Sequence, residues 1–294
     1  MFCTAGKALD WFSSYLSDRV QAVNGQVSSQ KKLHYWVPQS SVLGPILVTL
    51  YIQPLSKVIS PSRCGHHKFA DDTQLHQSST PSDFYSLIVD VERCVDSVGI
   101  WMTGNRLKLN NDKTEALLVG SRKRVSVSQE NHLRVGNHDI SFKGRVKNIG
   151  VYTDATLSMV KHTDHISRSA YLEIEIRRIS SIRNLLTTKA AAQLMCSFVL
   201  SRLDYCNSLF IDIKWDQMYR LQKVQNHAAK AVFRKNRHVH VRPLLKALHW
   251  LPVKDRIIFK IATLVFLFLW YPATIPVIVS LCIHSFSHAS FQFR

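Results

Sequence analysis

Two adjacent carboxylates, Asp71 and Asp72, are the sharpest chemical feature of the sequence. They lie within the stretch HHKFADDTQLH (66–76), where Lys68–Ala70 and Thr73–Leu75 have the composition of short strands. The pattern predicts a β-hairpin with both aspartates in its turn, where neighbouring side chains can converge. Carboxylate oxygens suit a hard cation such as Mg²⁺, and phosphoryl transfer often uses two such ions. The alternative is an ordinary solvated turn, because aspartates are common turn residues.

A stripe of basic residues is the second candidate site. Basic side chains recur at helical spacing, with no acidic residue among them, at Arg220, Lys223, His227, Lys230 and Arg234. The spacing places them on one face of a predicted helix. Such a face can neutralise the phosphates of a nucleic acid, and the alternative is an ordinary solvated helix surface.

The composition supports a polyanionic partner. The 294 residues contain 38 Lys and Arg against 20 Asp and Glu, a formal net charge of +18, and the excess is larger after residue 150. This charge argues against the acidic surface of many metabolic enzymes and favours nucleic acid or an anionic membrane face. The six cysteines form no CxxC pair, so neither a zinc site nor a disulfide framework is predicted. The N-terminus lacks the features of a secretory signal, which predicts an intracellular protein, nuclear or cytoplasmic.

The first half of the chain must position the aspartates, and its patterns predict mixed structure. An amphipathic helix is expected at 5–18, extended segments at 20–24 and 33–37, and a mostly buried helix at 39–57. Thr80 and Pro81 signal the start of a helix that continues to about residue 102, with Thr80 as N-cap and Asp83 as N3 acceptor. Residues 106–152 read as β-rich, with alternation at Leu107 and Leu109, a strand at 116–119, a hairpin from Leu133 to Ile140 and one further strand from Val146 to Tyr152.

The second half is predicted to be almost entirely helical, with helices near 162–185, 188–206, 214–236 and 253–270. Residues 261–283 contain no charged residue, and this stretch is long enough for a membrane span. Pro272 and Pro276 interrupt that stretch, so the alternative is an apolar helix that ends near Trp270.

Several segments, in order, resemble the reverse transcriptases, and more closely the polymerase palm of LINE-type, non-LTR retrotransposons. The segments are VPQSSVLGPILVTLYIQPL (37–55), FADDTQLH (69–76), WMTGNRLKLNNDKTEALLVGS (101–121) and VKNIGVYTDATLSM (146–159). Later helical segments resemble the thumb, and the likeness extends from about residue 6 to about residue 266. The resemblance implies an α+β fold: an incomplete palm of antiparallel sheet with helices at 1–159, a basic helical thumb at 160–270, and an apolar divergent tail at 271–294.

The resemblance also implies roles for individual residues. Asp71 would be the main Mg²⁺ ligand and Asp72 the supporting one, with RNA and DNA as template and primer and no small-molecule cofactor. Phe69 would pack under the turn, Gln39 and Ser40 would lie near the nucleotide or template, and Gly150 and Val151 would contact the primer. Lys113 stands where the family has a lysine, which could neutralise the leaving pyrophosphate; the alternative is a turn lysine.

The sequence departs from the family pattern in ways that predict an inactive, truncated copy. Polymerase chemistry of this kind needs a third carboxylate on an earlier strand, and Asp10 and Asp18 both belong to the predicted first helix or its end. Ser40 and Trp36 stand where the family usually has glycine, and a side chain there can crowd the nucleotide pocket. A palm without its first strand is expected to leave a neighbouring strand as an open edge.

Overall fold

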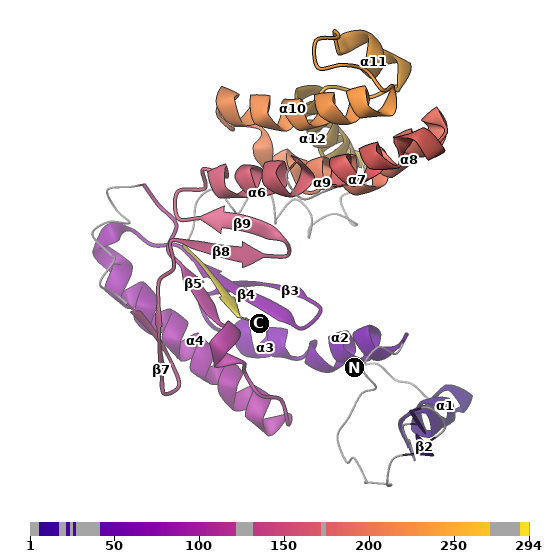
Figure 1. The fold of residues 1–294 in the computed structure, drawn as a ribbon. Coiled ribbons are helices and arrows are strands. Elements are labelled where there is room, and N and C mark those ends of the chain that lie inside the picture. Colours follow the sequence, from indigo (N-terminus) through magenta and orange to yellow (C-terminus); the bar gives the residue numbers. More distant parts are fainter. Residues whose placement is uncertain are drawn as a thin grey trace.

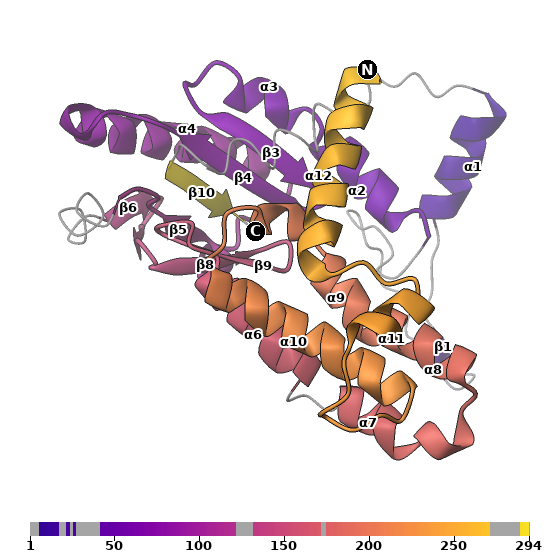
Figure 2. The ribbon, with the colours of Figure 1, turned by 90° about the horizontal axis from the view of Figure 1, so that it is seen from above.

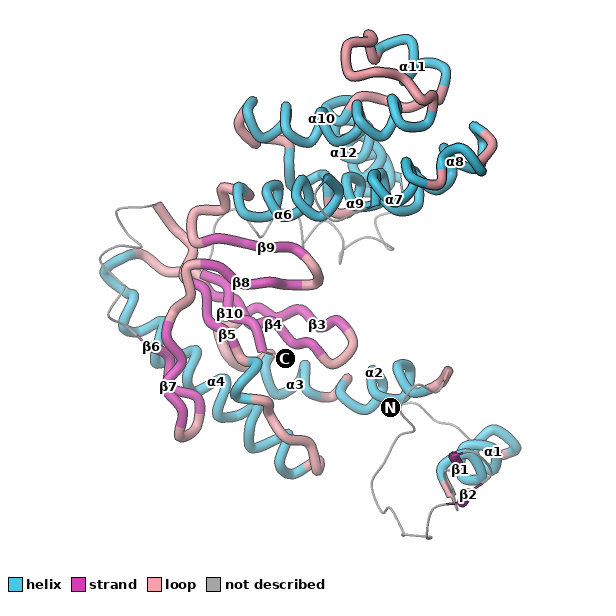
Figure 3. Tube along the Cα trace, in the orientation of Figure 1, coloured by secondary structure: helices cyan, strands magenta, loops and turns pink. Residues whose placement is uncertain are grey.

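The structure is a computed structural model, which describes residues 6–17, 22–23, 26–27, 42–121, 132–171, 175–270 and 289–293. Four strands form the main sheet: β3 (Gly65–Phe69), β4 (Asp72–Gln77), β5 (Glu115–Leu117) and β10 (Ala289–Phe293). Helices α3 (Leu55–Ile59) and α4 (Phe84–Gly104) lie on one side of it and the hairpin of β8 (Arg145–Asn148) and β9 (Val151–Asp154) on the other, and beyond that hairpin lies a layer of helices (Figure 1). Figure 3 shows the same division, with the strands gathered between the helix pair below and the helical layer above. The predicted α+β fold is confirmed.

The N-terminal elements match their prediction in type. Helix α1 covers Lys7–Leu16, and short strands β1 (Ala22–Val23) and β2 (Gln26–Val27) pair antiparallel. The predicted extended segment at 33–37 lies outside the described residues.

The prediction of one mostly buried helix at 39–57 is wrong. The structure has two short helices instead, α2 (Gly44–Ile52) and α3 (Leu55–Ile59). Pro54 stands between them, and a proline ring clashes with the preceding turn and supplies no N–H. Within α2 only Gly44 and Ile52 are buried, so most of this apolar helix is exposed rather than covered.

The hairpin and the long helix that follows are confirmed. Strands β3 (Gly65–Phe69) and β4 (Asp72–Gln77) pair antiparallel, and helix α4 covers Phe84–Gly104. One face of α4 is buried and packs on α3 and the hairpin, and its buried residues are Leu87, Ile88, Val91, Cys94, Val95 and Val98. The start of the helix differs from prediction, because a 3₁₀ turn η1 (Pro81–Asp83) precedes it and the Thr80 hydroxyl donates to the Asp83 carboxylate at 2.5 Å.

The sheet has an unexpected central strand. Its order is β3-β4-β10-β5, where β5 is Glu115–Leu117 and β10 is Ala289–Phe293. The expected open edge beside β4 is therefore wrong, because a strand from the C-terminal tail occupies that position. The tail beyond residue 270 thus contributes to the sheet, although the sequence suggested no such role.

Two further hairpins follow β5. Strands β6 (His132–Val135) and β7 (His138–Ser141) form the predicted hairpin and pack on α4, and β8 (Arg145–Asn148) pairs with β9 (Val151–Asp154). The single strand predicted at 146–152 is thus wrong, since Ile149 and Gly150 both have positive φ and form a two-residue turn. Leu107 and Leu109 lie in no strand, and the chain continues through a 3₁₀ turn, η2 (Asn111–Lys113).

The remainder is helical, as predicted, with more interruptions. The elements are α6 (Val160–Tyr171), α7 (Glu175–Ser181), η3 (Arg183–Leu185), α8 (Thr188–Met195), a π-helical turn η4 (Cys196–Leu200), α9 (Ser201–Asp204), η5 (Asn207–Phe210), α10 (Trp215–Val232), α11 (Arg242–Ala247) and α12 (Val253–Trp270). Helix α11 was not predicted. Helix α12 reaches Trp270, and the rest of the uncharged stretch predicted at 261–283 lies outside the described residues. In the described part of the chain, no helix combines the length and apolar character needed to cross a bilayer.

Two separate hydrophobic cores hold the protein together. One joins α3, α4 and the hairpins from Leu55 to Ile140, and the other joins the helices from Val151 to Ile257. A small cluster of Leu117, Val146 and Ala155 connects β5 with β8 and β9. The helical core therefore begins in β9, a few residues before the boundary predicted at 159/160.

Candidate functional site

The turn between β3 and β4 carries the two candidate metal ligands. Phe69 pairs with Asp72, which leaves Ala70 and Asp71 as the two turn residues. Ala70 has φ +52°, a conformation that costs a non-glycine residue about 1–3 kcal/mol. Asp71 is exposed at the tip, whereas Asp72 is half-buried as the first residue of β4. The predicted hairpin is confirmed, but the prediction that both aspartates lie in its turn is wrong, because Asp72 pairs with Phe69 and begins β4.

Phe69 does not lie where it was expected. Its side chain is 60% exposed, so it does not pack under the turn. Lys68 anchors the hairpin instead: its Nζ donates to the backbone carbonyls of Ile52 (3.3 Å) and Gln53 (3.1 Å) at the end of α2. Carbonyls at the end of a helix can accept further hydrogen bonds, so Lys68 ties the hairpin to the end of α2, where the Gln53 carbonyl also accepts the N–H of Ser56. Burial lowers the pKa of Lys68. The sequence analysis did not single out this residue, although it stands directly before the FADD stretch.

The two aspartates of the hairpin carry the kind of oxygen donors that divalent ions prefer. Magnesium is commonly held by one or two carboxylates together with waters and substrate phosphates, and Asp71 and Asp72 can supply the carboxylates. When bound, the ion would stabilise the charge of a transferring phosphoryl group. Among the residues that the structure describes, no group of three or more His, Cys, Asp or Glu side chains could hold a metal ion.

The remaining predicted residues of the polymerase site lie in different environments, and two of them are outside the described residues. Lys113 is exposed in η2, where its backbone N–H is accepted by Asn110 Oδ1 at 3.3 Å, as expected for a turn lysine. Gln39 and Ser40 lie outside the described residues. Gly150 is exposed in the β8–β9 turn, and Val151 is buried in the helical core.

The β8–β9 turn is tied to the helical part of the protein. The Tyr205 hydroxyl donates to the carbonyl oxygen of Ile149 at 2.5 Å. A Cβ added to Gly150 would lie 3.4 Å from the ring of Tyr205. The turn that was predicted to contact a primer is therefore fixed against α9, which positions it relative to the helices.

The residues of the predicted basic stripe on α10 fall into two groups that make different contacts. Arg220 forms an ion pair with Asp164 of α6 at 2.8 Å, and Lys223 Nζ lies 4.6 Å from the ring centroid of Tyr219. Further along, Lys230 donates to the carbonyl of Arg237, and Arg234, already past the end of the helix, donates to the carbonyl of Arg183. Lys230 and Arg234 therefore bind backbone carbonyls. Arg220, Lys223 and His227 are the stripe residues that line a cavity.

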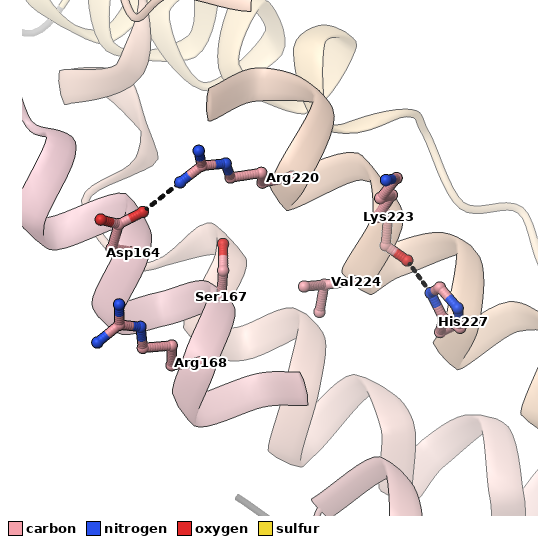
Figure 4. A pocket seen from close by; sticks show the side chains of 7 residues that line it. All are labelled: Asp164, Ser167, Arg168, Arg220, Lys223, Val224 and His227. Carbon is pink, nitrogen blue, oxygen red and sulfur yellow. Dashed lines mark hydrogen bonds and ion pairs between the residues drawn. The ribbon is translucent and has the colours of Figure 1, made fainter. Parts of the chain in front are cut away.

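That cavity lies between α6 and α10 and has a volume of about 400 Å³ (Figure 4). Arg220, Lys223, Val224 and His227 line it from α10, and Asp164, Ser167 and Arg168 line it from α6. A neighbouring cavity of about 220 Å³ shares Asp164 and Arg168 and is also lined by Arg145, Tyr152, Lys161 and His165. Together the two cavities form what is called here the basic groove, which leads from α10 to the β8–β9 hairpin.

The basic groove includes residues that the sequence analysis missed. Lys161, His165 and Arg168 recur at helical spacing along α6, which was a detectable signal of the same kind as the stripe on α10. Arg145 comes from β8 and could not have been assigned to this surface without the fold. Positive side chains outnumber the single acid, Asp164, so the groove suits an anionic ligand.

Fold and site together define an α+β protein in which a palm-like antiparallel sheet carries a two-aspartate hairpin and lies next to a basic helical layer. A family profile for reverse transcriptase (RNA-dependent DNA polymerase) matches residues 2–153, just over half of the chain. The chain belongs to the reverse transcriptase family. No curated protein and no solved structure matches it.

Proposed function

We propose that this chain is a nucleic-acid-binding protein derived from the RNA-directed DNA polymerase of a LINE-type, non-LTR retrotransposon, and that it does not synthesise DNA by itself. Membership of the reverse transcriptase family is the observation that carries the proposal. The order and spacing of the quoted segments, from VPQSS to VKNIGVY, support the LINE-type assignment.

The lack of polymerase activity is proposed from the composition of the sheet. Two-ion phosphoryl transfer needs carboxylates that converge from neighbouring elements. The strand beside β4 is β10, whose sequence ASFQF contains no acid. Strand β10 therefore adds no carboxylate to those of Asp71 and Asp72. They suit the binding of one ion better than the assembly of a two-ion centre.

Binding of nucleic acid is proposed from the basic groove. Its cationic side chains come from α6, α10 and β8, so they form a surface rather than a single row. Tyr152, which also lines the groove, offers a ring beside these charges, and bases of single strands stack on such rings. We infer RNA and single-stranded DNA as ligands, bound with little preference for sequence. The same function implies an intracellular protein, nuclear or cytoplasmic.

A charge-reversal experiment tests the binding. Arg168 and Lys223 are exposed and line the groove from opposite helices. Replacing both with Glu should weaken binding of a short single-stranded RNA. It should also flatten the slope of log affinity against log salt by roughly 1.4, because each phosphate contact contributes about 0.7 for single strands. The matched control replaces Lys189 and Lys246, two exposed lysines outside the groove, with Glu. Equal loss in both variants, or an affinity that does not depend on salt, would contradict the proposed site.

A primer-extension assay tests the absence of synthesis. The purified chain, supplied with template, primer, nucleotides and Mg²⁺ or Mn²⁺, should give no extended product. A product that disappears in Asp71→Ala would refute this part of the proposal and would show that the hairpin is a working metal site.

A further inference from the structure

The middle of the sheet is formed by a strand from the far end of the chain. Strand β10 lies between β4 and β5 and is antiparallel to both (Figure 2). Its five residues pair with Gln77 to Thr73 of β4, and its central three pair with Leu117 to Glu115 of β5. Strands β4 and β5 are not paired with each other, so β10 is the element that joins them.

The register matches the alternation in the strand's sequence. Position 291 pairs with Leu75 and Ala116, which are both 1% exposed, and position 293 pairs with Thr73, which is 4% exposed. Paired residues share one face of a sheet, so positions 291 and 293 of the strand are in register with buried residues of β4 and β5. Ser290 and Gln292 alternate with them. The place between β4 and β5 therefore suits an extended segment whose apolar residues alternate with polar ones.

Strand β5 depends on this pairing. Elsewhere β5 is held by a parallel bridge between Ala116 and Phe142 and by the hydrogen bond from Lys143 N–H to the Ala116 carbonyl at 2.8 Å, and it lies near β7 and β8. If β10 left, β4 and β5 would face each other across a gap one strand wide, each with unpaired N–H and C=O groups. Such edges are templates for an added strand.

We propose that the gap between β4 and β5 is a strand-acceptor site. Its resident occupant is the segment 289–293 of this chain, and a peptide of the same sequence can take its place from outside. Recognition uses main-chain hydrogen bonds to both neighbours, and the alternation of apolar and polar residues fixes the register. This inference does not rest on the proposed function.

Peptide binding to full-length variants tests the proposal. Phe291→Pro removes an N–H from the centre of the strand and should release it, since proline is excluded from central strands. A labelled peptide with the sequence HASFQFR should then bind this variant with one-to-one stoichiometry. Binding to the unmodified chain should be at least about tenfold weaker, because the resident strand leaves few sites open. Phe291→Val is the matched control, since valine keeps the strand in place, and it should behave like the unmodified chain.

Hydrogen exchange locates the site in the same samples. Phe291→Pro should accelerate exchange in 73–77 and 115–117 together, and the peptide should slow it again, while 215–232 stays protected throughout. A peptide carrying the proline should have no effect. The proposal is overturned if all three chains bind the peptide equally, if the proline leaves exchange at 73–77 and 115–117 unchanged, or if protection is also lost in 215–232.

Discussion

Arg183 is a buried arginine that joins the ends of several helical segments. Its side chain is 6% exposed, and Nε and Nη2 donate to the carbonyl of Val232 at 2.9 and 2.6 Å. Further hydrogen bonds go to the carbonyl of Leu186 and the hydroxyl of Thr188. Carbonyls at the end of a helix lack partners within it, so this guanidinium satisfies the C-terminus of α10.

Replacing Arg183 with Met should therefore destabilise the helical part. We expect the free energy of unfolding to fall by about 2–4 kcal/mol, because hydrogen bonds to charged groups contribute about 1.5–3 kcal/mol and the buried carbonyls would be left without partners. Urea denaturation followed by circular dichroism measures the change. Arg178→Met, at an exposed position of α7, is the control and should change the free energy by less than about 0.5 kcal/mol. Similar effects of the two substitutions would contradict this role for Arg183.

His162 should make the protein less stable in mild acid. It is 2% exposed, and its Nδ1 accepts the backbone N–H of Tyr152 at 3.4 Å. Burial, with a smaller contribution from His165, lowers the pKa of His162 from 6.5 to about 4. As pH falls below 6.5 the unfolded chain takes up the proton while the folded chain resists it, so stability is lost between pH 6.5 and pH 4. The loss from this residue is at most about 3 kcal/mol.

Unfolding free energies measured at pH 7 and pH 4.5 check this expectation. His162→Gln keeps a hydrogen-bond acceptor but does not titrate in this range, so its stability should change less between the two pH values. The same change in both chains would show that other groups cause the acid sensitivity.

Some residues of the site were predictable from sequence and others were not. The aspartates of the hairpin were found because turn chemistry is local. The basic residues of α10 were found by their spacing, but their ion pairs and hydrogen bonds were not, because Asp164 and Arg183 belong to other elements. Helical periodicity shows which residues share a face, and it cannot show what a second helix places against that face.

At the scale of elements, α12 combines a buried start with an exposed apolar end. Val253 and Ile257 are buried in the helical core, whereas Phe259, Phe266 and Trp270 are 64%, 55% and 69% exposed. Contiguous exposed apolar surface favours association with other apolar surfaces. Residues 261–270 belong to the uncharged stretch that suggested a membrane span. Most of their apolar side chains are thus exposed on the surface of the protein.

Replacing Phe259 and Phe266 with Glu should reduce self-association, measured by sedimentation velocity, without a large loss of stability. The control is Ile257→Glu, only two residues from Phe259. Because it buries an unpaired charge at a 1% exposed position, it should destabilise the fold by several kcal/mol. Unchanged self-association in the double variant would show that this surface is not the one that associates.

Elements were predicted well where the signal was local and strong. The FADD hairpin, α4 and the β6–β7 hairpin each have a clear turn or a long apolar stripe. The break at Pro54 between α2 and α3 was not predicted, because the apolar run on both sides of it favours one continuous helix. Strand β10 was missed for a different reason: five residues of alternating pattern are common, and its partners β4 and β5 are remote in sequence.

At the scale of the whole molecule, the two cores should differ in stability. One face of helix α10 is buried along its length, with Leu221, Ala228 and Val232 at 0% exposure, and it packs on several other helices. The first core is flanked by the mostly exposed α2 and by β5, which depends on a strand from the tail. Fewer buried apolar contacts correspond to easier local opening.

Hydrogen exchange should therefore be slower in 215–232 than in 44–59 and 115–117. The measurement follows exchange of native full-length protein over minutes to hours. Uniform protection across both regions would show that the first core is as tightly closed as the second, contrary to this expectation.

The tail strand also has a consequence for the order in which the protein is made. Strands β4 and β5 leave the ribosome long before residues 289–293 are synthesised, so the nascent chain carries both unpaired edges while the helices are already able to form. Exposed edges in a partly made protein invite pairing with other chains. Emergence of residues 289–293 from the ribosome would then be the event that closes the sheet, and a ribosome paused before that point would present the form most in need of chaperones.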